Sequence, residues 1–111
     1  MIYLTFTETE KFICEANKIL GEEGISELQL HLCEYPDDGA IIRASNGIWK
    51  IRWAASGRGK RGGARIIYYY AVSRERILLL DVYPKNKKAD LTADELKNLK
   101  DVLQVWLEKI R

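Results

Sequence analysis

The sequence feature that most constrains the fold is a segment of alternating apolar and cationic residues, followed by a glycine-rich loop and a second apolar segment. In the first segment, two tryptophans and an isoleucine alternate with Lys50 and Arg52. This period of two is that of a β-strand with one apolar and one positively charged face. The loop at residues 56–63 contains too much glycine and charge for a helix or a sheet interior. Because residues 65–70 are again strand formers, the pattern predicts a β-hairpin that displays cations on one face.

Three strands are predicted around this loop, over residues 48–54, 64–72 and 77–83. Their short connections predict an antiparallel meander. The second and third strands are apolar almost throughout, so other elements should cover both of their faces. Residues 40–46 could form an edge strand or an irregular crossing.

Two helices are predicted before the meander. A short strand at residues 2–6 precedes a capping box, in which Thr7 caps a helix and Glu10 reaches back to it. Apolar residues at helical spacing continue to Gly21, a typical terminator. A second helix is predicted from residue 22 to about residue 35, and the two helices form an acidic hairpin whose apolar stripe packs on the sheet.

The C-terminal helix has the clearest start signal. Thr92 and Glu95 form a capping box, and Leu91 and Leu96 form a hydrophobic staple. The order of elements predicts a single α+β domain over residues 1–111. Its expected form is an antiparallel sheet of about four strands, with the N-terminal helical hairpin and the C-terminal helix packed on it.

Positive charge is concentrated in the middle of the chain, although the net charge of the whole chain is only +2. Residues 1–38 carry a net charge of −7, residues 39–88 a net charge of +10, and residues 89–111 a net charge of −1. No acidic residue occurs between Gly39 and Arg74. Such a basic centre in a nearly neutral chain indicates a surface that binds nucleic acid.

The cysteine and histidine content argues against a metal site. Cys14 and Cys33 are the only cysteines and His31 is the only histidine, so they cannot supply the four ligands of a structural zinc. Both thiols are expected to be free and buried in a reducing cytosol. His31 is expected to be a helix-packing residue, and a ribonuclease mechanism with two histidines is excluded. Neither a metal nor another cofactor is expected.

A cytoplasmic location is expected from the apolar segments. The N-terminus lacks the basic region of a signal peptide and reaches acidic residues early. The longest apolar runs are too short to span a membrane, so no membrane partner is expected.

The cations are candidates for phosphate binding. Lys50 and Arg52 project from one face of their strand about 6.6 Å apart, close to the repeat of adjacent phosphates on an extended single strand. Arg65 opens the next strand and can reach the same face. The third strand ends in an aromatic residue, an amide and three lysines: Tyr83, Lys85, Asn86, Lys87 and Lys88. The glycine-rich loop adds three cations, which are expected to contact a nucleic-acid backbone: Arg58, Lys60 and Arg61.

The glycine-rich loop is not a mononucleotide phosphate loop. That motif needs Ser or Thr after its lysine, whereas Arg61 follows Lys60 here. It also needs a glycine five residues before Gly59, where Ala54 stands. A basic arm that follows a nucleic-acid backbone fits the composition better.

Any chemistry at this surface must depend on cations, because Asp81 and Glu75 are the only acids of the basic centre. Asp81 lies in an apolar strand and could equally pair with Arg65 or a neighbour. Cleavage of RNA by its own 2′-hydroxyl suits cations, since arginines bidentate to phosphate stabilise the dianionic phosphorane. A lysine crowded by other cations can act as the base if its pKa falls by about 3 from about 10.4.

Three ordered motifs carry a family resemblance: Lys50-Ile51-Arg52, residues 57–69, and Tyr83-Pro84-Lys85-Asn86 with Asp90-Leu91. Together they resemble the HigB toxins of the RelE/ParE superfamily of type II toxin–antitoxin systems. The resemblance implies a RelE-like fold and a bacterial, cytoplasmic toxin. It implies a ribosome-dependent, metal-independent endoribonuclease that cleaves mRNA in the A site and inhibits translation. The implied partners are the ribosome with its small-subunit rRNA, mRNA and a HigA-like antitoxin, which either covers the cations or blocks ribosome entry.

The resemblance also implies roles for individual residues. RelE-type toxins use two basic residues on the first meander strand, matched by Lys50 and Arg52, and an arginine that opens the next strand, matched by Arg65. A further basic residue follows the last strand, where Lys85 and Asn86 lie. The residues expected to bind RNA of the ribosome are Arg58, Lys60, Arg61, Lys87 and Lys88.

The base-stacking residue has no direct match. RelE has a tyrosine in its C-terminal segment, whereas no tyrosine follows Tyr83 here. Tyr83 or Tyr68 would take that role, or stacking is absent.

Two other functions stay open on the sequence alone. A ParE-like toxin would inhibit DNA gyrase by binding, without nuclease activity, because one fold supports both functions. ParE-type chains need not keep the cationic patch, which argues against this alternative. The second alternative is a non-toxic basic module that binds RNA or the ribosome.

Overall fold

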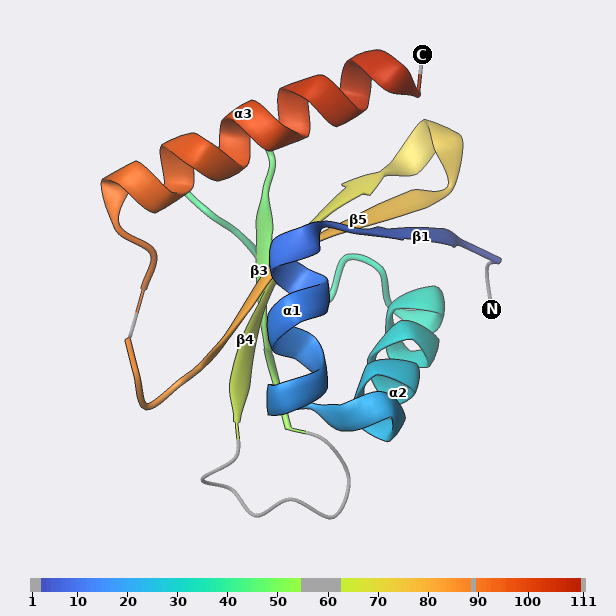
Figure 1. Ribbon diagram of the computed structural model, residues 1–111. Helices are drawn as coiled ribbons and strands as arrows, with labels where there is room; N and C mark the ends of the chain where they lie inside the picture. The colour runs from blue at the N-terminus through green and yellow to red at the C-terminus, as the bar shows by residue number, and fades with distance from the viewer. Residues whose placement is uncertain (1–2, 55–62, 89, 111) are drawn as a thin grey trace.

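The computed structural model describes residues 3–54, 63–88 and 90–110 of the chain. This part of the chain forms a five-stranded sheet with helices on both faces, as Figure 1 shows. The strand order across the sheet is β1-β5-β4-β3-β2. The elements in chain order are β1 (Thr5–Glu8), α1 (Glu10–Ile19), α2 (Gly21–Glu34), β2 (Ala40–Ile41), β3 (Trp49–Trp53), β4 (Ala64–Ala71), the 3-10 turn η2 (Val72–Arg74), β5 (Arg76–Pro84) and α3 (Ala93–Lys109).

The α+β fold and the meander predicted from the sequence are confirmed. β3, β4 and β5 pair antiparallel in sequence order. β2 is an edge strand of two residues that pairs antiparallel with β3, which resolves the alternatives for residues 40–46.

The N-terminal strand departs from the expected antiparallel sheet of about four strands. β1 pairs in parallel with β5, so the described sheet is mixed and has five strands. Short connections determine the direction only of strands that follow one another. Because most of the chain separates β1 from β5, their relative direction depends on tertiary packing.

The first helix starts later than the sequence pattern indicates. Thr9, not Thr7, is the N-cap of α1, and its side-chain oxygen accepts a hydrogen bond from the Phe12 N–H at 3.1 Å. Thr7 and Glu8 are instead paired with β5. Since the strand continues through these residues, the predicted capping box of Thr7 and Glu10 is wrong.

The other helix signals are confirmed. Gly21 has a φ of 73°, the left-handed conformation that separates α1 from α2. The capping box of Thr92 and Glu95 is present at the start of α3. Leu91 and Leu96 both pack against the apolar core of that helix.

The helices bury two apolar cores, one on each face of the sheet (Figure 1). α1 and α2 cover one face through residues such as Phe12 and Leu28. α3 covers the opposite face through residues such as Leu103 and Trp106. β4 and β5 contribute buried residues to both cores, as their apolar sequences predict. Within the described part of the chain, no helix is both long and apolar enough to cross a membrane.

The cysteines are free, but the expectation that both are buried is wrong. Cys14 is exposed and Cys33 is partly exposed. Cys14 follows the buried Phe12 by two positions, and two positions turn a helix by about 200°. The Cys14 side chain therefore points away from the core.

Candidate active site

The cations of β3 project from the face of the sheet that α3 covers. Ile51 packs in the core under α1 and α2, and successive strand residues point to opposite faces, so Lys50 and Arg52 point to the α3 side. The ladder places Arg52 opposite Arg65, and Arg65 opposite Tyr83. One row across three strands thus contains Arg52, Arg65 and Tyr83, with Lys50 two residues along the same face. These four predicted site residues are brought together.

The two arginines of this row have no acidic partner. Within residues 3–54, 63–88 and 90–110, neither Arg52 nor Arg65 forms an ion pair. The Arg65 Nε is buried and lacks a hydrogen-bond acceptor in this part of the chain. Like charges directly opposite one another on a ladder are destabilising. The pair is therefore suited to an anion that binds from outside.

Lys50 differs from the two arginines because it forms an ion pair with an acidic residue. Its Nζ donates a hydrogen bond of 2.7 Å to Oδ1 of Asp90, which lies between β5 and α3. This bond lowers the pKa of Asp90, and the positive charge of Lys50 and of Arg65 lowers it further. Sequence reasoning missed Asp90 as a site residue, although Asp90-Leu91 belongs to the third motif.

Lys88 is also paired with an acid. Its Nζ hydrogen-bonds Oε2 of Glu95, while Oε1 of Glu95 accepts from the Thr92 N–H at 2.9 Å in the capping box. The bonds from Lys88 and then from Thr92 lower the pKa of Glu95 to about 2. The start of α3 is thus tied to the segment that follows β5. Sequence reasoning found Glu95 as a cap but not as a partner of Lys88.

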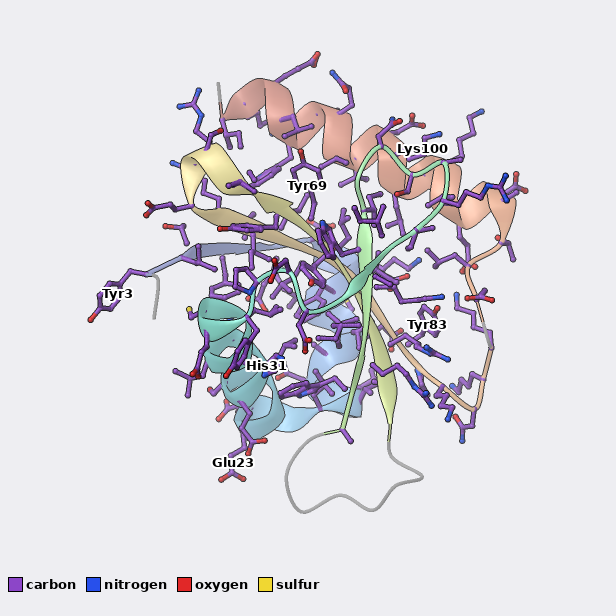
Figure 2. The ribbon with its side chains drawn as sticks, turned by 180° about the vertical axis from the view of Figure 1, so that it is seen from behind. Tyr3, Glu23, His31, Tyr69, Tyr83 and Lys100 are labelled. Carbon is purple, nitrogen blue, oxygen red and sulfur yellow. The ribbon has the colours of Figure 1, made fainter. Side chains whose placement is uncertain are left out.

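Tyr83 is buried, and its ring packs beneath these cations. Its side chain lies on the α3 side of the sheet among nitrogen-bearing side chains, as Figure 2 shows. The residue is 5% exposed, and its Oη is buried without a hydrogen-bond partner among the described residues. Lys88 Nζ lies 4.7 Å from the ring centroid. Burial raises the pKa of Tyr83, and the charge of Asp90 adds to this effect, so the phenol stays neutral.

The remaining predicted residues after β5 lie in an exposed turn. The Lys85 N–H donates a hydrogen bond of 3.1 Å to the Gly63 carbonyl, which fixes the turn beside the start of β4. Lys85, Asn86 and Lys87 are exposed. Within the described residues, their side chains form no ion pair or hydrogen bond with the row of β3, β4 and β5. The predicted loop cations, Arg58, Lys60 and Arg61, lie outside the described residues.

An irregularity in β5 keeps Asp81 out of the site. In the ladder between β4 and β5, Ile67 pairs with Asp81, and the next residue of β4, Tyr68, pairs with Leu79. Leu80 is therefore an additional residue on β5 and forms a β-bulge. Past this bulge, the Asp81 carboxylate lies on the α1 side, 3.1 Å from Lys11 Nζ. Asp81 therefore pairs with α1 and not with Arg65.

His31 lies on the α2 side and takes no part in the cationic site. Its Nε2 is 2.8 Å from Oδ2 of Asp38. Its ring centroid is 5.0 Å from that of Trp53 and 5.3 Å from that of Tyr35. These contacts fit a packing residue, and Figure 2 shows His31 beside α2.

The arrangement can bind phosphate but offers no metal site in the described residues. No three His, Cys, Asp or Glu side chains converge there. The groups that converge are two guanidinium groups with no ion pair in the described part of the chain, a paired ammonium group and a neutral phenol. The fold and this site define a small α+β protein whose sheet presents cations to an anionic ligand.

Comparison with known proteins identifies the family. A family model described as "RelE toxin of RelE / RelB toxin-antitoxin system" matches residues 23–110. The match spans most of the chain and includes every cation of the site, so the chain belongs to the RelE toxin family. The fold is also that of the E. coli toxin RelE, solved in the free state as a mutant with two arginines changed to alanine. That structure matches with a TM-score of 0.60 and 17% sequence identity, over 88% of this chain and 98% of that chain.

Proposed function

We propose that this RelE-family protein is a HigB-type toxin that cleaves translated mRNA in the ribosomal A site. The observation that carries the proposal is the row of Arg52, Arg65 and Tyr83 with Lys50 beside it. Two arginines that have no acidic partner among the described residues, opposite one another on a ladder, favour binding of a phosphate that neutralises them. The activity is that of a ribosome-dependent, metal-independent endoribonuclease.

The chemistry is an attack of the RNA on itself. A base takes the proton of the 2′-hydroxyl, the 2′-oxygen bonds to phosphorus, and the bond to the 5′-oxygen breaks as that oxygen takes a proton. The products are a 2′,3′-cyclic phosphate and a 5′-hydroxyl end. Arg52 and Arg65 bind the non-bridging oxygens and stabilise the negative charge that develops on them.

The lysines take different roles. Lys50 supplies positive charge on the same face as the two arginines, and in the free protein its Nζ is hydrogen-bonded to Asp90. Lys85 is exposed in the turn after β5, and we propose that its side chain contacts the phosphate of the reacting nucleotide. Asn86, beside it, is a hydrogen-bond donor and acceptor for the substrate.

The proposed role of Tyr83 is to pack its ring against the cations of the site. A ring that is 5% exposed offers no free face on which a base can stack. We therefore assign no base-stacking role to Tyr83, and its part is to support Arg65 and Lys88. Arg58, Lys60, Arg61 and Lys87 are proposed to bind ribosomal RNA through its backbone.

The proposed partner is a HigA-like antitoxin, and the proposed location is the bacterial cytoplasm, where ribosomes and translated message are found. The cationic face of the sheet is the surface that such an antitoxin must either cover or keep away from the ribosome.

The test is cleavage of a translated message in a cell-free system by wild type and by Arg65→Ala. Removing a group that stabilises the phosphorane is expected to lower the cleavage rate by about 10²–10³-fold. The matched control is Arg76→Ala, because Arg76 is an exposed arginine about 23 Å along β5 from Tyr83. Circular dichroism checks that both variants fold. Wild-type cleavage by a folded Arg65→Ala variant would refute the mechanism.

The cleavage assay, together with assays of gyrase supercoiling and of growth on expression, separates the alternatives. A ParE-like protein would leave the message intact and inhibit gyrase supercoiling of DNA. A non-toxic RNA-binding module would do neither and would not arrest growth on expression.

A further inference from the structure

Resting on the proposed function, we propose that Asp90 occupies the phosphate position of the free protein and that RNA displaces it from Lys50. Asp90 would then be an internal competitor for the ligand, released when the substrate backbone binds. The family resemblance and the proposed catalytic roles do not require this contact.

The position of the Asp90 carboxylate carries the inference. It is hydrogen-bonded to Lys50 at 2.7 Å. The charge of Arg65 lowers the pKa of Asp90, and the charge of Asp90 raises the pKa of Tyr83. These three residues lie on one face across β3, β4 and β5. A single carboxylate therefore lies among the groups on which a phosphate would bind.

The surroundings of Asp90 allow it to leave. Its side chain is 70% exposed, whereas that of Lys50 is 28% exposed. Asp90 lies after the end of β5 and before the N-cap Thr92, so it belongs to neither the sheet nor α3. It is absent from both apolar cores. Lys50 is fixed by its strand, and the acid is the partner that can move.

The hydrogen bonds of Asp90 differ from those of Glu95. Glu95 also pairs with a lysine of the site, but its second oxygen caps α3, so releasing it would break the helix start. Among the described residues, the Asp90 side chain has a single hydrogen bond, to Lys50, and no structural role comparable to that cap. Displacement of Asp90 alone leaves the fold intact.

The experiment measures binding of a fluorescein-labelled, single-stranded RNA with 2′-O-methyl groups, which the protein cannot cleave. Fluorescence anisotropy is recorded at several salt concentrations for wild type, Asp90→Asn and Asp101→Asn. Asp101 is an exposed acid of α3, so its substitution makes the same change in net charge away from the site. The double variant Lys50→Gln with Asp90→Asn is compared with Lys50→Gln alone, which tests whether the effect requires Lys50.

Asp90→Asn is expected to bind RNA about two- to fivefold more tightly than Asp101→Asn, the range of an exposed ion pair. The slope of log affinity against log salt should be the same in both variants, because Lys50 neutralises one phosphate of the RNA in each of them. In the Lys50→Gln background the gain should disappear.

Three outcomes would overturn the inference: equal affinities of Asp90→Asn and Asp101→Asn, weaker binding by Asp90→Asn, or no RNA binding by any form. Weaker binding would mean that Asp90 orients Lys50 for the ligand. Failure of the proposed function is a different result, namely that wild type leaves a translated message intact. The binding comparison decides the role of Asp90 whichever way that cleavage assay turns out.

Discussion

At the scale of single residues, Tyr83 shows how a buried polar group can belong to a site without touching the ligand. Its hydroxyl has no partner among the described residues, while its ring lies under Lys88 and beside Arg65 in the ladder. A hydroxyl left without a partner contributes little to stability, whereas the ring contributes its packing.

Tyr83→Phe is therefore expected to change the free energy of unfolding by less than about 0.5 kcal/mol. Cleavage should stay within about threefold of wild type, because an interaction that is not made in the transition state does not change the rate. Urea unfolding and the cell-free cleavage assay measure the two quantities. Tyr83→Ala is the comparison, with an expected loss of about 3–5 kcal/mol from the cavity. A large loss of cleavage in a stable Tyr83→Phe variant would instead assign the hydroxyl to the reaction.

The sequence predicts the cations of the site better than their partners. Lys50 and Arg52 share a face because of the strand period, and Arg65 joins them through the hairpin. Asp90 cannot be placed in this way, because its contact with Lys50 depends on the path of the segment between β5 and α3. No local pattern encodes that path.

At the scale of elements, the start of α3 joins helix stability to the site. Glu95 caps the helix with one carboxylate oxygen and binds Lys88 with the other. Its pKa is lowered from 4.5 to about 2 in the folded state. A carboxyl group whose pKa falls on folding stabilises the protein above its unfolded pKa.

This stabilisation should be fully present above pH 4.5 and should be lost as the pH falls towards 2. Glu95→Gln is expected to lower the melting temperature at neutral pH and to reduce its fall over that acidic range. Thermal unfolding followed by circular dichroism at a series of pH values measures both effects. Glu108→Gln, on the exposed last turn of α3, is the matched control. Parallel pH profiles for Glu95→Gln and wild type would contradict the assignment.

Among the elements, those with local signals are predicted well and those with long-range partners are not. The α3 capping box and the three meander strands follow from neighbouring residues. β1 is misjudged in direction and extent, because its pairing with β5 depends on residues distant in the sequence. Because Thr7 and Glu8 pair with β5, α1 is capped by Thr9 and not by Thr7 as the sequence predicts.

At the scale of the whole molecule, charge is sorted by face. The helical hairpin belongs to residues 1–38, which carry a net charge of −7, and it covers the side of the sheet opposite the cations. An RNA strand is therefore attracted to one side and repelled from the other. At physiological salt, however, exposed charges act over only about 8 Å.

The double variant Glu22→Gln with Glu23→Gln tests this sorting, since both residues are exposed at the start of α2. Its affinity for RNA should rise at low salt and should equal that of wild type at about 0.15 M salt. Anisotropy titrations with the 2′-O-methyl RNA measure both conditions. A gain that persists at the higher salt would show that the hairpin itself contacts RNA.

The additional residue Leu80 on β5 has a consequence for the genetics of this protein. Ile67 pairs with Lys50 on one side and with Asp81 on the other. In a regular ladder without the additional residue, the Asp81 side chain would point to the α3 side, as those of Lys50 and Ile67 do. An in-frame loss of the Leu80 codon would turn this carboxylate towards the arginines and remove one core leucine. We expect such a deletion among spontaneous alleles that survive without an antitoxin, since it would place a negative charge on the cationic face.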